Sequence, residues 1–117
     1  MTTVAPAEYA APARQRDRVS RELLRITGRM AVEVRITRTR WPDGLHWVAM
    51  VLVIDPRAPW GRREVPLTEG GQHREIALLL RGAFPNADWA RAQDYDVVTG
   101  TLREHLVRLP ACLRDAS

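Results

Sequence analysis

The stretch Met30-Ala-Val-Glu-Val-Arg-Ile-Thr-Arg-Thr-Arg40 decides the fold, because its apolar and polar residues alternate. Val32, Val34 and Ile36 fall on one face, and the residues between them are charged. An alternation with a period of two is typical of a strand that packs on one face and meets water on the other. The sequence therefore predicts a strand over residues 30–40.

A turn and a second strand follow this stretch. Trp41-Pro42-Asp43-Gly44 has turn chemistry, because proline presets φ and glycine tolerates the positive φ that ends a tight turn. Residues 46–54 are apolar at nearly every position, as expected for a strand that is covered on both faces. We therefore predict a β-hairpin over residues 30–54.

Helical periodicity and chain breakers predict the remaining elements. Val19, Leu23 and Ile26 share one helical stripe, and Gly28 is a suitable C-terminal stop. Pro66 cannot donate to a strand ladder, so a strand that contains it must lie at a sheet edge. The predicted elements are an N-terminal helix over 14–27, an edge strand near 63–67, and two or three C-terminal helices over 72–82, 87–93 and 101–109, with residues 94–98 compatible with strand or helix. This order predicts an α+β fold, a small antiparallel sheet backed by helices on one side.

Length and composition predict one folded domain. The 117 residues are 45% hydrophobic and 27% charged, which is ordinary for a soluble globular protein. We predict a single domain over 14–113, with a flexible tail over 1–13 and a frayed C-terminus over 114–117. No apolar run approaches the roughly 20 residues of a transmembrane helix. Cys112 is the only cysteine, so the sequence predicts no internal disulfide and favours a cytoplasmic location.

All 18 basic residues are arginine, and the net charge is +4. The codon usage of a GC-rich genome accounts for the missing lysine, but the physical consequence is the same whatever the cause. Each cation can form two parallel hydrogen bonds with a carboxylate or a phosphate, and each can stack on an aromatic ring. The modest positive excess is compatible with a polyanionic partner without requiring one.

Arginine and tryptophan recur along the hairpin and the loop that follows it. Arginines that hold phosphates, combined with Trp41 and Trp60 stacked on bases, would suit a nucleic-acid-binding or regulatory module. The predicted last helix over 101–109 would add a second, helix-based site. The candidate binding residues are Arg35, Arg38, Arg40, Trp41, Arg57, Trp60, Arg62, Arg63, Arg103 and Arg108.

Two other function classes stay open at this point. Trp and Arg are also the enriched anchors of protein interfaces, so the same residues suit an adaptor or a homo-oligomer. For a small enzyme, the group to test is Asp94, Asp96 and His105, because a carboxylate beside a histidine can perform acid–base chemistry. No spacing of His, Cys and Asp resembles a metal site, and we predict no metal and no cofactor.

Overall fold

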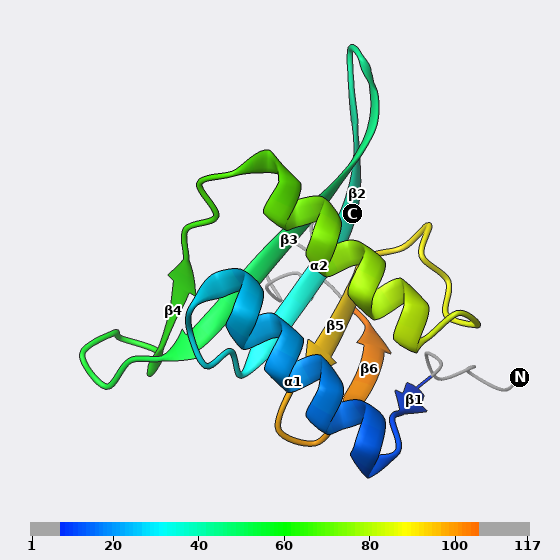
Figure 1. Cartoon of the computed structure of the whole chain (residues 1–117). Helices are drawn as coiled ribbons and strands as arrows, with labels where there is room; N and C mark the ends of the chain where they lie inside the picture. The colour runs from blue at the N-terminus through cyan, green and yellow to red at the C-terminus, as the bar shows by residue number, and fades with distance from the viewer. Residues whose placement is uncertain (1–7, 106–117) are drawn as a thin grey trace, which may run out of the picture.

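Two helices lie side by side on one face of a six-stranded sheet in a computed structural model of the chain, which describes residues 8–105 (Figure 1). All strand pairs are antiparallel, and the spatial order is β1-β6-β5-β2-β3-β4. Neither of these two helices is long and apolar enough to cross a membrane. In chain order the elements are β1 (Glu8–Ala10), α1 (Ala13–Thr27), β2 (Glu33–Trp41), β3 (Gly44–Ile54), β4 (Arg62–Val65), α2 (Gly70–Ala83), β5 (Gln93–Asp96) and β6 (Thr101–Glu104).

The predicted fold class is wrong, because within the described chain α2 is followed by strands and not by further helices. Residues 87–92, predicted as a helix, form turns and irregular backbone. Residues 101–104, predicted to begin the last helix, form β6. Residues 106–109 of that predicted helix lie outside the described residues. The protein is therefore a strand-rich α+β protein with a wide antiparallel sheet.

The turn between β5 and β6 explains the error. The helical prediction rested on the spacing of Leu102, Leu106 and Leu109, of which only Leu102 belongs to the described chain, where it is buried in the sheet. Gly100 adopts a φ of 74°, and its N–H donates to the Asp96 carbonyl. The Asp96 carboxylate also accepts two backbone N–H bonds from the turn. A carboxylate cap and a left-handed glycine stabilise a hairpin turn here.

The sheet is also wider than predicted, because strands are added at the edge opposite β4. Glu8–Ala10, which lies in the stretch predicted as a flexible tail, forms β1 and pairs with β6. At the other edge β4 pairs with the end of β3, as predicted for an edge strand, but it stops at Val65, immediately before Pro66, and not at residue 67. Proline has no N–H to donate to the ladder, which is consistent with this early end.

The core lies between the helices and the sheet. Val34, Val51 and Leu102 of the sheet and Leu23 and Leu80 of the helices are almost fully buried in one cluster. Burial of each such side chain stabilises the fold by about 1.5–3 kcal/mol.

The opposite face of the sheet is not covered by any element among residues 8–105, so the expectation that the second strand is covered on both faces is wrong for the described chain. On that face Met50 and Leu52 of β3 are half-buried, and Ile54 is 68% exposed.

Candidate binding site along the hairpin

The predicted binding residues do not gather on one surface. Trp41 lies at the tip of the β2–β3 hairpin, which extends beyond the helices (Figure 1). Trp60, which is 90% exposed, lies in the loop after β3, at the other end of that strand. With a rise of about 3.3 Å per residue, the length of β3 separates the two tryptophans by roughly 30 Å. They belong to two separate regions.

Several of the predicted arginines are already paired with carboxylates. These ion pairs are Arg35–Asp94, Arg62–Glu33, Arg63–Asp55 and Arg103–Glu8. Within residues 8–105, Arg38, Arg40 and Arg57 form no ion pair. Arg108 lies outside the described residues. Of the predicted binding arginines in the described chain, those without an ion pair are therefore Arg38 and Arg40 of the hairpin and Arg57 near Trp60.

The hairpin tip holds an exposed aromatic side chain in a defined position. The rings of Trp41 and His46 stack with their centroids 4.4 Å apart. His46 Nε2 lies 2.8 Å from a carboxylate oxygen of Asp43, and this hydrogen bond lowers the pKa of the Asp43 carboxyl. Trp41 is 49% exposed and Leu45 is 51% exposed. The tip thus presents apolar surface to solvent on an ordered turn.

Trp47 lies nearer to the helices, with two guanidinium groups close to its ring. The Arg81 guanidinium of α2 is 4.7 Å from the Trp47 ring centroid, and that of Arg38 is 5.9 Å away. Such contacts contribute about 0.5–1 kcal/mol each at exposed sites. On the same face of the hairpin, Arg40 lies opposite Leu45. We call Arg38, Arg40, Arg74 and Arg81 the hairpin cations.

A groove runs where β3 passes the N-terminus of α2. It consists of two adjoining hollows of about 450 and 260 Å³, which share His46, Trp47 and Gly70. The larger hollow is completed by Leu45 and Arg74, and the smaller by Trp41, Val48 and His73. We call the two together the hairpin groove.

The hairpin groove wraps around an edge of β3. Odd-numbered residues of β3, such as Ala49 and Val51, are buried toward the helices, so Trp47 faces the same side. His46 and Val48 then face the opposite side of the sheet. A groove lined by residues of both faces must follow the strand edge between them.

That edge has no strand partner among the described residues. β4 pairs with β3 only from Val51 to Ile54, which leaves the part of β3 nearer the tip unpaired on this side. The Ala49 N–H donates instead to His73 Nδ1, at 3.0 Å. We call the β4-facing side of Leu45–Ala49 the free edge of β3.

Most of the residues of this site were not predicted from the sequence. Trp41, Arg38 and Arg40 were among the candidates, whereas His73, Arg74 and Arg81 come from α2 and reach the hairpin only through the fold. The available signal was the mismatch in strand length, because Pro66 limits β4 to four residues while β3 has 11 residues.

The residues named for an enzyme are partly brought together, on the face of the sheet away from the helices. His105 Nδ1 lies 2.7 Å from Asp94 Oδ2, and Arg35 Nε lies 2.8 Å from Asp94 Oδ1. Asp96 is not part of this cluster, because its carboxylate caps the β5–β6 turn. Both carboxylate oxygens of Asp94 are engaged, so the arrangement ties β2, β5 and the end of β6 together.

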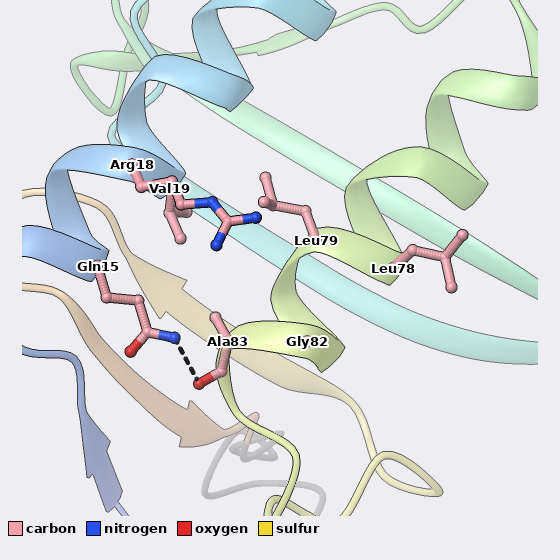
Figure 2. A pocket seen from close by; sticks show the side chains of 7 residues that line it. All are labelled: Gln15, Arg18, Val19, Leu78, Leu79, Gly82 and Ala83. Carbon is pink, nitrogen blue, oxygen red and sulfur yellow. Dashed lines mark hydrogen bonds between the residues drawn. The ribbon is translucent and has the colours of Figure 1, made fainter.

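A smaller hollow of about 170 Å³ lies between α1 and α2 (Figure 2). Gln15 Nε2 donates across it to the Ala83 carbonyl at 3.1 Å, and Arg18 extends from α1 toward α2. Ligand pockets usually enclose about 300–1,000 Å³. This hollow is better explained as a packing gap that the Gln15 hydrogen bond bridges.

No group of three His, Cys, Asp or Glu side chains within residues 8–105 is placed to hold a metal ion. The chain matches no protein-family model, no curated protein and no solved structure.

Proposed function

We propose that this chain is a recognition module that binds a protein partner at the hairpin groove. The observation that carries this proposal is the free edge of β3, which lies between an exposed Trp41 and the hairpin cations. Trp and Arg dominate the binding energy of protein interfaces. An unpaired strand edge adds backbone donors and acceptors that a polypeptide can match.

The distribution of charge supports a protein partner over a purely electrostatic one. Arg35, Arg62, Arg63 and Arg103 have carboxylate partners within the chain, so each would have to leave one to bind phosphate. Arg103 also lies on strand β6 and not on a helix, so it does not belong to the helix-based site predicted over 101–109.

Selection from a random peptide library displayed on phage tests the proposal, at about 150 mM salt, where long-range charge effects are screened. We expect the wild type to enrich peptides that Trp41→Ala binds at least about tenfold more weakly. Trp60→Ala is the matched control, because Trp60 is also a solvent-exposed tryptophan but lies at the far end of β3. Failure to enrich any peptide, or equal loss in both variants, would contradict the proposal.

Nucleic-acid binding is the second candidate, and one observation favours it. The hairpin cations form no ion pair within the described chain, and three of them lie near Trp47: Arg38 and Arg81 at its ring, and Arg74 in the same hollow. Phosphate contacts by such a set must weaken steeply with salt.

Fluorescence anisotropy with labelled single-stranded DNA, duplex DNA and RNA separates this candidate from the first. Binding that collapses between about 50 and 200 mM salt, and weakens in Arg40→Gln, would support nucleic-acid recognition. The absence of binding at the lower salt would exclude it.

A further inference from the structure

We propose that the hairpin groove takes an extended acidic peptide, which adds a strand to the sheet along the free edge of β3. This inference rests on the proposed protein-binding function and names the chemistry of the partner. The peptide would place acidic side chains toward the helices and apolar side chains on the opposite face.

The hydrogen-bonding pattern of β3 shows which backbone groups are available. The N–H and C=O groups of a strand residue point to one side, and the next residue points to the other. The Asp55 N–H donates to Gly61 and the Ala49 N–H donates to His73, both on the β4 side. Leu45 and Trp47 are odd-numbered like Ala49 and Asp55, so their N–H and C=O groups also point to the free edge. His46 and Val48 point to β2 instead.

Geometry limits the length of the added strand. β4 occupies the edge from Val51 onward, and His73 covers the Ala49 N–H. The remaining groups are the N–H and C=O of Leu45 and Trp47 and the C=O of Ala49, which offer two donors and three acceptors. An added strand would therefore pair over about four to six residues, a length typical of peptides bound by strand addition.

The two faces of the edge differ in chemistry. A peptide residue opposite Leu45 or Trp47 projects toward the helices, among the hairpin cations. A residue opposite His46 or Val48 projects to the other face, beside Trp41. Asp43 at the tip is already engaged by His46, and Glu69 caps the N-terminus of α2. The edge therefore selects a peptide in which acidic and apolar residues alternate.

Charge also argues against a second copy of this chain as the occupant. Two chains paired through their β3 edges would bring two sets of hairpin cations together. Like charges at an interface are unfavourable, whereas an acidic strand complements them. The acidic peptide is therefore the occupant that the surface fits.

The test uses the full chain and a fluorescent peptide of about six residues, in which glutamate and valine alternate. Two control peptides have the same composition. In one all glutamates precede all valines, and in the other the backbone is N-methylated at every second residue. We expect both controls to bind at least about tenfold more weakly than the alternating peptide. The blocked sequence cannot satisfy both faces, and the methylated backbone cannot pair with β3.

Hydrogen exchange gives a second readout at single residues. Peptide binding is expected to slow amide exchange at Leu45 and Trp47, and to leave His46 and Val48 unchanged because these already bond to β2. Arg74→Glu is expected to weaken binding at least about tenfold, with Arg57→Glu, far from the groove, as the matched charge control.

The outcomes separate this inference from the proposed function. If the methylated peptide binds as well as the unmethylated one while Trp41→Ala still removes binding, strand addition is wrong and protein recognition stands. If no peptide binds and only nucleic acid does, both are wrong. Dimerisation that protects Leu45 and Trp47 without peptide would replace the acidic partner with a second copy.

Discussion

At the scale of single residues, the buried hydroxyl of Tyr95 is the clearest destabilising feature of the core. Its side chain is fully buried on β5 against Phe84, with ring centroids 5.6 Å apart, and its hydroxyl has no hydrogen-bond partner in the described structure. A buried hydroxyl without a partner costs about 1–3 kcal/mol. We expect Tyr95→Phe to raise the free energy of unfolding by about 1 kcal/mol in urea denaturation. A loss of stability would mean that an ordered water satisfies the hydroxyl.

The same residue predicts a pH dependence. Burial raises the pKa of the Tyr95 phenol above its ordinary value of 10.0. At a pH above the pKa of this tyrosine in the unfolded chain, the folded protein keeps a phenol proton that the unfolded chain has released. The free energy of unfolding therefore falls as pH rises above about 10. Denaturation of the wild type and of Tyr95→Phe between about pH 9 and 11 should show the steeper decline in the wild type. An equal decline of the unfolding free energy in both proteins would contradict a raised pKa of Tyr95.

At the scale of elements, the β5–β6 turn depends on one glycine. Gly100 has a φ of 74°, and a Cβ there would lie 2.8 Å from Cδ of Arg16, in the stem of that side chain. Gly28, which ends α1, has a φ of 70° and open space around the Cβ position. We expect Gly28→Ala to destabilise by about 1 kcal/mol and Gly100→Ala by at least about 2 kcal/mol in the same denaturation assay. Equal costs would show that Arg16 moves aside.

The elements also show what could be predicted from the sequence. The hairpin and the two helices carry periodicity over nine or more residues, and α1 and α2 form close to the predicted bounds. β5 and β6 have four residues each, so only two side chains per strand face the core. An alternation over four residues is a weaker signal than the helical spacing of leucines that continues from Leu102. The sequence therefore predicted a helix where the protein forms a strand. The Asp96 cap and Gly100 were the better signal.

The candidate site was only partly predictable for a different reason. Trp41, Arg38 and Arg40 are close in sequence, and turn chemistry marks their position. His73 and Arg74 join the groove through contacts 24 residues or more from β3, which depend on how α2 crosses the sheet. The local sequence pattern carries no information on such a crossing. It also grouped Trp60 with Trp41 in one predicted site, although the length of β3 separates them.

At the scale of the whole molecule, the hairpin tip extends beyond the helices, so folding and recognition should be separable. Residues 40–45 are all exposed, and the core residues Ile36 and Ala49 lie well below them. Thr39 and His46 are directly paired, and they lie two residues before and after the pair Trp41–Gly44 that closes the present two-residue turn. They therefore have the same hydrogen-bonding pattern and can close a two-residue turn as well. Residues 40–45 can therefore be replaced by Asn-Gly without a change of register.

We expect this shortened chain to keep its thermal midpoint within about 8 °C of the wild type, which corresponds to roughly 1 kcal/mol for a domain of this size. The same change removes Trp41, Arg40 and the edge groups of Leu45, so binding of the alternating acidic peptide should fall at least about tenfold. A matched chain with Trp60→Ala should keep both properties, because that side chain is exposed at the other end of β3. A large drop in the midpoint would show that the tip stabilises the fold. Unchanged peptide binding would place the recognition surface elsewhere on the protein.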